Sequence, residues 1–190
     1  QSHLSGKRWD QALEWLASRP DIREVILSGG DPLTLNNRRV QELLSALAEI
    51  PHLRRLRIHS RTPVVIPERL DEPLLGLLSN SRWQTALVLH ANHPREISDG
   101  LAERCRQWRR EGITLLNQSV LLAGVNDCVD TLEALSDRLH QAGVMPYYLH
   151  QLDAVQGAAH FAVTDSMAMQ LHGELRGRLP GFLVPRLSRE

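Results

Sequence analysis

The chain has 190 residues, of which 42% are hydrophobic and 23% charged, a composition typical of a single globular domain. Its 22 basic and 22 acidic residues cancel, so charge gives no reason to expect nucleic acid or an anionic membrane as the main partner. No apolar run reaches the roughly 18–20 residues of a membrane span, and no signal-peptide pattern opens the chain. The two cysteines, Cys105 and Cys128, are too few for a disulfide framework, which makes the cytoplasm the expected compartment.

Lysine is nearly missing from the chain, because Lys7 is its only lysine and arginine supplies the other fixed positive charges. Lysine is the residue that forms Schiff bases with carbonyl groups, so such chemistry would have to use Lys7 or a lysine outside this chain. Lys7 lies in a polar opening stretch and is a poor candidate. The chain begins without a methionine and ends directly after an apolar run, so we interpret it as a piece excised from a longer protein.

Strand-like and helix-like segments alternate along the chain. The strand-like segments begin roughly thirty residues apart, which is the length of a strand plus a crossover helix. In chain order, the expected elements are a helix near Lys7–Ser18, a strand at Ile22–Ser28, a helix at Asn36–Glu49, a strand at Leu53–His59, a helix at Asp71–Asn80, a strand at Thr85–His90, a helix at Ile97–Glu111, a strand at Thr114–Val120, a helix at Val129–Gln141, a strand at Val144–His150 and a helix near Asp165–Arg178.

Capping and stop signals support these boundaries. Asn36 or Asn37 is placed to cap the helix between the first two strands, and Pro51 prevents that helix from continuing. Gly112 and Gly143 follow two later helices, at the position where a left-handed residue commonly ends a helix. The helix ends are therefore marked independently of the apolar periodicity.

Alternating strands and helices imply an α/β fold with a parallel sheet and right-handed crossovers. The near-identical units favour a barrel over an open sheet that reverses its order midway. A complete eight-stranded barrel needs about 250 residues. With 190 residues and no linker or low-complexity stretch, we predict a single domain over residues 1–190, folded as a partial barrel.

Each predicted strand changes from apolar to polar residues at its carboxyl end, which is where α/β folds bind ligands. We therefore expect one polar rim at this edge of the sheet. The residues that form it are Gly29, Gly30 and Asp31; His59, Ser60 and Arg61; His90, Asn92 and His93; Asn117, Gln118 and Ser119; and His150, Gln151 and Asp153.

Each of these groups also has a purely structural explanation that the residues alone leave open. The two glycines can form only a tight turn, Arg61 can be an ordinary exposed arginine, and Asp153 can cap the next turn. His90 and His93 lack a third ligand at suitable spacing, so they are more typical of hydrogen bonds to loops than of a metal site. The earlier cysteine is expected to pack within a helix, and the later one to lie near a helix start, where a free thiol is usually inert.

Several ordered segments carry a family resemblance that covers essentially the whole chain. The segments are LSGGDPL (Leu27–Leu33), RIHSRTPVVIPERL (Arg57–Leu70), LHANHPREI (Leu89–Ile97), LNQSVLLAGVND (Leu116–Asp127) and MPYYLHQLD (Met145–Asp153). In order and spacing they resemble the lysine 2,3-aminomutase family of radical S-adenosylmethionine (SAM) enzymes. The form LHQLDAVQGAAHF and the ending LPGFLVPRLSRE are most similar to the bacterial branch that makes β-lysine for modifying translation elongation factor P.

The resemblance implies a partial (β/α)6 radical-SAM-type barrel, of which the five expected strands are the second to the sixth. The first strand and the CxxxCxxC loop that holds a [4Fe-4S] cluster are then expected before Gln1, and the lysine that binds pyridoxal phosphate beyond Glu190. In the implied reaction, SAM is cleaved reductively at the cluster to a 5′-deoxyadenosyl radical that takes hydrogen from carbon 3 of L-lysine. Pyridoxal phosphate assists migration of the nitrogen from carbon 2 to carbon 3. This chain alone is expected to be inactive.

The resemblance also implies three groups of site residues, which contact SAM, bind lysine and lie at pyridoxal phosphate. They are, respectively, Ser28, Gly29, Gly30, Asp31, His90 and Gln118; Arg61, Asp153 and Glu190; and Ser60, Tyr148 and His150. Asp31 and its neighbours would accept the amino group of SAM, and His90 and Gln118 would contact its adenosyl portion. Arg61 would pair with the α-carboxylate of lysine, for which a planar guanidinium is suited, and Asp153 would hold the distal ammonium with Glu190 as a second acid.

Two departures from the family pattern limit what the resemblance implies. His150 stands where many lysine aminomutases have a tyrosine near pyridoxal phosphate. Cys128 matches a cysteine that helps to bind zinc in longer members, but its partner cysteines are lacking in the short branch, so no metal is expected in this chain. The implied partners are L-lysine and, indirectly through its lysyl-transferring enzyme, elongation factor P. Neither nucleic acid nor a membrane is expected, and a homo-oligomer is left open.

Two other functions are compatible with the pattern of strands and helices. Another (β/α) barrel enzyme that acts on an anionic substrate would need its catalytic residues within this chain, where we find neither a catalytic lysine nor a metal triad. A non-catalytic binding module built on the barrel would have no cluster cysteines upstream. The residues that precede Gln1 in the parent gene would separate these alternatives.

Overall fold

The computed structural model describes residues 6–153 and 157–189 as a single curved parallel sheet with helices on one face. Its strands follow one another in sequence order: β1 (Glu24–Leu27), β2 (Arg55–Ser60), β3 (Gln84–His90), β4 (Thr114–Leu121), β5 (Met145–Gln151) and β6 (Arg186–Ser188). The helices are α1 (Gly6–Ala17), α2 (Asn37–Ala48), α3 (Thr62–Val65), α4 (Glu72–Ser79), α5 (Asp99–Arg110), α6 (Val129–Gln141) and α7 (Asp165–Arg178).

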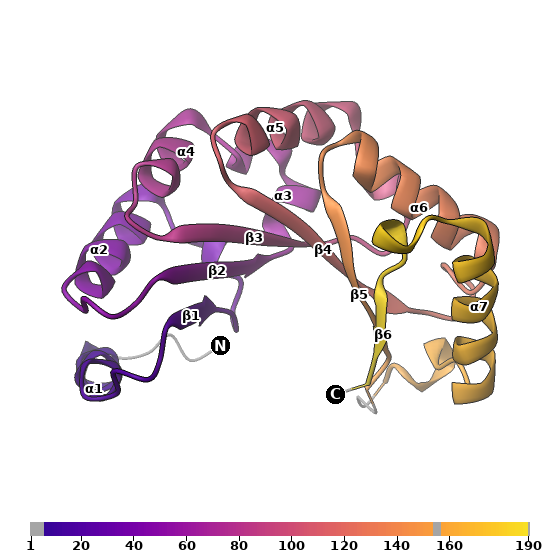
Figure 1. The fold of residues 1–190 in the computed structure, drawn as a ribbon, viewed down its shortest axis with the longest axis horizontal. Helices are drawn as coiled ribbons and strands as arrows, with labels where there is room; N and C mark the ends of the chain where they lie inside the picture. Colours follow the sequence, from indigo (N-terminus) through magenta and orange to yellow (C-terminus); the bar gives the residue numbers. More distant parts are fainter. Residues whose placement is uncertain (1–5, 154–156, 190) are drawn as a thin grey trace.

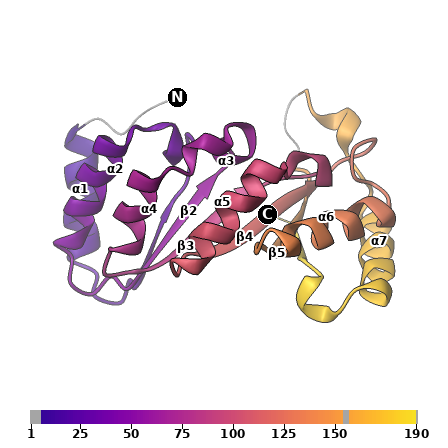
Figure 2. The same cartoon turned by 90° about the horizontal axis from the view of Figure 1, so that it is seen from above.

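The sheet bends into an arch whose convex side carries the helices, while β1 and β6 form its two ends (Figure 1). The view from above shows the same succession of helices along one side of the strands (Figure 2). Each inner strand pairs in parallel with the strands before and after it in sequence. This arrangement confirms the α/β class and the partial barrel that the sequence predicts. Among the described helices, none combines the length and the hydropathy needed to cross a membrane.

The predicted strands are all present, and the sheet has one strand more than the sequence predicted. The first strand is shorter than expected, because only Glu24–Leu27 of the predicted Ile22–Ser28 pairs with β2. The additional strand, β6, extends the sheet beyond β5, with Leu187 opposite Leu149. It has only 3 residues, too few to show a period of two in the sequence.

The predicted helix ends are confirmed by their geometry. Asn36 caps α2, because its side chain accepts a hydrogen bond from the backbone N–H of Arg39. Gly112 and Gly143 have φ values of 86° and 79°, the left-handed region that favours glycine after a helix. The short helix α3 was not predicted; it begins directly after Arg61 and has only 4 residues.

Strand residues alternate between a buried face under the helices and the concave face of the arch. On β2, Leu56, Ile58 and Ser60 are buried, whereas the intervening Arg57 and His59 are only partly buried. The larger hydrophobic cluster packs β1–β4 against the helices α2, α4, α5 and the later part of α6, and a smaller one lies beneath the start of α6 and α7. Because burial of these apolar residues fixes the register, it also fixes which polar residues face the concave side.

Candidate functional site

Two of the predicted SAM-contacting residues lie next to each other on the sheet. His90 at the end of β3 is in register with Gln118 on β4, and Gln118 is in register with Tyr148 on β5. The Tyr148 ring lies 5.1 Å from the ring of His150, between centroids. The structure therefore brings residues predicted for SAM and for pyridoxal phosphate onto neighbouring positions of the concave face.

His59 belongs to the same face; the sequence placed it on the polar rim but assigned it to no ligand. Its ring meets that of His90 edge to face, with centroids 5.8 Å apart. The signal was present, because His59 alternates with the buried Ile58 and Ser60 along β2. Burial, and secondarily the charge of His59, lowers the pKa of His90 to about 4, so His90 is neutral at pH 7.

His90 has an unused hydrogen-bonding atom. Its Nε2 is buried and has no hydrogen-bond partner among the residues that the structure describes. A buried polar atom without a partner is costly, so such an atom at a strand end is well suited to bind a ligand. This observation favours the prediction that His90 contacts a bound molecule.

The turn after β1 exposes its main chain. Gly29 and Gly30 have φ values of 80° and 53°, which glycine adopts without the strain that a side chain would bring. A Cβ atom on either residue would meet nothing within 4 Å, so the space above both is open. With the exposed Ser28 beside them, these residues let a ligand approach the backbone closely.

Asp31, in contrast, already has partners for both of its carboxylate oxygens. Oδ1 accepts hydrogen bonds from Leu33 N (3.1 Å) and Ser60 Oγ (2.5 Å), and Oδ2 accepts from Arg61 N (2.7 Å) and Thr62 N (2.8 Å). Burial raises the pKa of Asp31, but the bonds from Ser60 and from the start of α3 outweigh it and hold the pKa below its usual value. The carboxylate therefore connects the turn after β1 to the end of β2, a structural role that the sequence did not predict.

Ser60 does not lie where a pyridoxal phosphate pocket shared with Tyr148 and His150 would place it. It is 1% exposed and alternates with Arg57 and His59, so it lies on the buried side of β2. Its hydroxyl is used by Asp31. Grouping Ser60 with the two ring-bearing residues on the concave face therefore needs correction.

Arg61 is held by a residue that the sequence analysis did not select. Its Nη2 donates to Glu96 Oε2 at 2.9 Å. The other oxygen of Glu96 accepts hydrogen bonds from the backbone of Asn92 (2.8 Å) and His93 (3.0 Å) in the loop after β3. The His93 side chain accepts a hydrogen bond from Arg95 N. This histidine therefore bonds to its own loop, as the sequence led us to expect.

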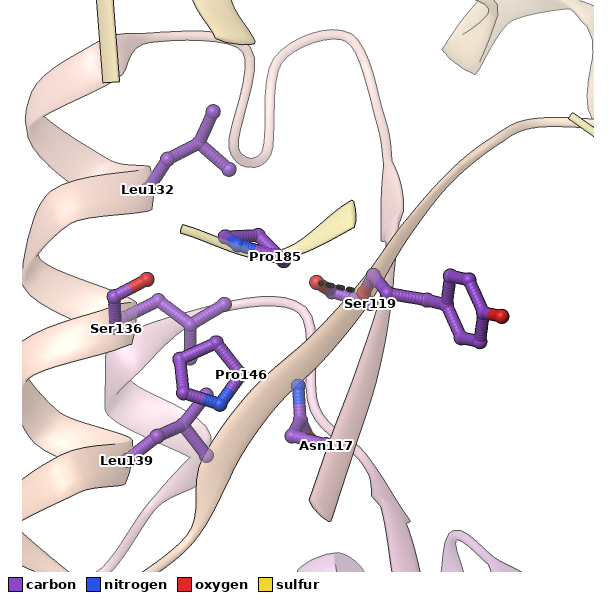
Figure 3. A pocket seen from close by; sticks show the side chains of 9 residues that line it. Asn117, Ser119, Leu132, Ser136, Leu139, Pro146 and Pro185 are labelled. Atoms are coloured by element: carbon purple, nitrogen blue, oxygen red, sulfur yellow. Dashed lines mark hydrogen bonds between the residues drawn. The ribbon is translucent and has the colours of Figure 1, made fainter. Parts of the chain in front are cut away.

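The other polar residues of the fourth strand are structural. Asn117 is buried and exchanges two hydrogen bonds with the backbone of Ala91, at 2.9 and 3.0 Å. Asn126 similarly donates to the carbonyl groups of Asn92 and Val120. Asn117 and Ser119 line a pocket on the side of β4 that faces α6 (Figure 3), with Leu132, Leu135, Ser136, Leu139, Pro146, Tyr148 and Pro185. Of the three polar residues Asn117, Gln118 and Ser119, Gln118 alone alternates onto the concave face.

A second polar group on the concave face connects β2 both to its neighbour β1 and to the more distant β5. Arg57 on β2 donates to Glu24 Oε2 on β1 at 3.1 Å and to the Tyr147 hydroxyl on β5 at 3.3 Å. These bonds join residues 33 and 90 positions apart, and no local pattern predicts them. Through Arg57, the concave side of β2 is therefore joined to β5 across the arch as well as to β1 beside it.

Of the remaining residues, one lies in the loop after β5, one lies outside the described part of the chain, and two are the cysteines. Asp153 is exposed just after β5, and Glu190 lies outside the described residues. Burial raises the pKa of Cys105 to about 12, whereas Cys128 is exposed at the start of α6. Within residues 6–153 and 157–189, no three histidine, cysteine or acidic side chains are grouped to hold a metal ion.

The sequence is closely similar to several known proteins. It is 50% identical over 184 residues to the L-lysine 2,3-aminomutases of Haemophilus influenzae and Escherichia coli, which covers 97% of this chain. Along nearly its whole length, the chain is similar to proteins named L-lysine 2,3-aminomutase. The enzyme of that name from Clostridium subterminale is 39% identical over 179 residues. The chain spans about half the length of these relatives: 54% of the first two and 43% of the third. No family model matches the sequence.

Solved structures of two radical SAM enzymes have a similar fold. A radical SAM methyltransferase from Sphaerobacter thermophilus superposes with a TM-score of 0.67 at 17% identity, over 97% of this chain and 57% of that one. Streptococcus suis SuiB bound to S-adenosylmethionine gives 0.67 at 12% identity, over 100% of this chain and 45% of that one. Identities this low show a shared fold, and they confirm the prediction of a radical-SAM-type barrel.

Proposed function

We propose that the full-length protein containing this chain is a radical SAM, pyridoxal phosphate-dependent isomerase that converts L-α-lysine to β-lysine. The observation that carries this proposal is the pairing of His90 with Gln118 on the concave face of a chain that is 50% identical to an L-lysine 2,3-aminomutase over 184 residues. The open Gly29-Gly30 turn lies at the same edge of the sheet. This chain would then supply surfaces that bind SAM and orient lysine.

The described residues fit SAM. The open main chain at Gly29 and Gly30 suits its amino acid portion, and the unpaired Nε2 of His90 beside Gln118 suits its adenosyl portion. When bound at a reduced cluster, SAM supplies the group that removes a hydrogen atom from carbon 3 of lysine. The two cysteines do not fit the cluster, because they are fewer than the three of a CxxxCxxC motif. Cys105 is in addition buried with a raised pKa, whereas a thiolate is needed to bind iron. The cluster ligands are therefore expected outside this chain.

The substrate would be held by opposite charges. Arg61 follows β2 and presents a half-exposed guanidinium for the α-carboxylate, while the exposed Asp153 follows β5 and would hold the distal ammonium. Tyr148 and His150 would form one side of a site for pyridoxal phosphate, whose conjugated ring allows the amino group to migrate. With neutral His90 nearby, these residues bind and orient the substrate and exclude water from it.

Activity of the full-length protein tests the proposal directly. After anaerobic reconstitution with iron, sulfide and pyridoxal phosphate, we expect SAM-dependent conversion of L-lysine to β-lysine, measured by mass spectrometry. Arg61→Ala and Asp153→Ala should each lower kcat/KM by at least about tenfold, which is 1.4 kcal/mol of transition-state binding. An exposed pair distant from the site, Arg19 and Asp21, provides matched alanine controls. A wild-type protein that makes no β-lysine would refute the function.

We also propose that the product serves the modification of elongation factor P in the cytoplasm. The support is the form LHQLDAVQGAAHF together with 50% identity to the bacterial relatives named above. In cells that lack the gene, elongation factor P should lose the mass of its β-lysine group, and added β-lysine should restore it. Residues 1–190 expressed alone should be inactive, because the sequence has neither a CxxxCxxC motif nor a lysine after Lys7.

A further inference from the structure

Arg61 is fixed at both ends by carboxylates from two other loops. Asp31, after β1, accepts its backbone N–H at 2.7 Å. Glu96, after β3, accepts its guanidinium at 2.9 Å. Three strand ends thus converge on one arginine, although the Arg61 side chain itself is 51% exposed.

Glu96 is itself rigidly placed. Its side chain is 25% exposed, and Oε1 accepts the backbone N–H groups of both Asn92 and His93. These two bonds orient the carboxylate so that Oε2 faces Arg61. The guanidinium gives one N–H to Glu96 and keeps further N–H groups for a second, planar partner such as a carboxylate.

We propose that Glu96 is a positioning residue that orients Arg61 to bind the α-carboxylate of lysine, an inference that rests on the proposed function. A half-exposed arginine otherwise samples many rotamers, and ordering it during binding weakens affinity. Glu96 orders this side chain before the substrate arrives. It acts on the carboxylate end of the substrate and not on the distal ammonium.

Glu96→Gln in the full-length enzyme isolates this role. The amide oxygen can still accept the bonds from Asn92 and His93, so the loop keeps its cap, but the amide NH2 then faces the donating Nη2 of Arg61. We expect KM for L-lysine to rise about fivefold with kcat within about twofold, as for a partly exposed ion pair. Inhibition by 1,5-diaminopentane, which lacks the carboxylate, should not change. KM for L-lysine and the inhibition constant of 1,5-diaminopentane are measured on the same active molecules. Partial misfolding therefore does not alter their ratio.

A matched control and a second variant complete the experiment. Glu103→Gln is the control, because Glu103 is also paired with an arginine, Arg106 at 2.6 Å, on the exposed side of α5. It should change neither KM for L-lysine nor inhibition by 1,5-diaminopentane. In an Arg61→Ala background, Glu96→Gln should have no further effect on KM, because the group that it orients is gone.

The outcomes separate this inference from the function on which it rests. A wild-type enzyme that makes no β-lysine would overturn both. An active wild type in which Glu96→Gln weakens lysine and 1,5-diaminopentane equally would overturn the positioning role alone, because Glu96 would then support the loop in general. An effect of Glu96→Gln that persists in the Arg61→Ala background would do the same.

Discussion

The carboxylate of Asp31 is expected to stabilise the fold, and Asp31→Asn tests this directly. The asparagine oxygen can keep the bonds from Leu33 N and Ser60 Oγ, but its NH2 would face the N–H groups of Arg61 and Thr62. The Arg61 N–H then loses its acceptor, and the Thr62 N–H keeps only its bond to Ser60 Oγ at 3.2 Å. A charged acceptor is also replaced by a neutral one.

The expected cost follows from these bonds and from partial solvent access. Hydrogen bonds to a charged group contribute about 1.5–3 kcal/mol each when buried. Asp31 is half-buried, so water compensates part of the loss. We expect Asp31→Asn to lower the free energy of unfolding by about 2 kcal/mol at pH 7.

The same bonds predict how the effect depends on pH. The pKa of Asp31 is lower in the folded protein than in the unfolded chain, so its stabilisation is fully present above the unfolded value of about 3.9. It is lost as pH falls through the lower, folded pKa. The difference in stability between wild type and Asp31→Asn should therefore be largest near neutral pH and shrink in acid.

Urea unfolding of the full-length apoprotein, followed by circular dichroism at pH 7 and in acid, measures both effects. Asp21→Asn is the matched control, because Asp21 also has a lowered pKa, through its bond with Arg19, but is fully exposed. It should unfold like wild type. If Asp31→Asn and Asp21→Asn unfold at the same urea concentration at pH 7, the connection between the turn after β1 and α3 does not contribute to stability.

Three further predictions concern the turn, the buried amide and the thiols. Gly30→Val should abolish SAM binding in calorimetry, because it strains a φ of 53° and fills the open approach, whereas Gly181→Ala, at a glycine with equally open space, should bind normally. Asn117→Ala should lower the free energy of unfolding by about 2–4 kcal/mol in urea, because two buried hydrogen bonds to the backbone at the end of β3 are lost. A decrease below about 1 kcal/mol would contradict a stabilising role for these two bonds. Mass-spectrometric mapping after brief iodoacetamide treatment at pH 8 should find Cys128 alkylated and Cys105 intact, since burial raises the pKa of Cys105 to about 12; equal labelling would refute that burial.

Local sequence patterns were sufficient for the order of elements and for the edge of the sheet where a candidate site is expected. Apolar segments with the period of a strand, amphipathic helices between them and the glycines at helix ends all depend on residues close together in the chain. These signals are strong because each is set by the backbone conformation of a few residues. The location of the polar rim followed from the rule that parallel strands present their carboxyl ends at one edge.

The tertiary structure was needed to separate the polar residues that face the concave side of the sheet from those that bond within the protein. Asp31 and Ser60 are 29 positions apart, and Arg61 and Glu96 are 35 apart. Bonds at such separations depend on the register and curvature of the sheet, which no local pattern encodes. For the same reason the sequence missed β6, whose 3 residues are defined only by their pairing with β5. The sequence was therefore enough to select the edge of the sheet as the candidate site, whereas packing set which polar atoms there remain available.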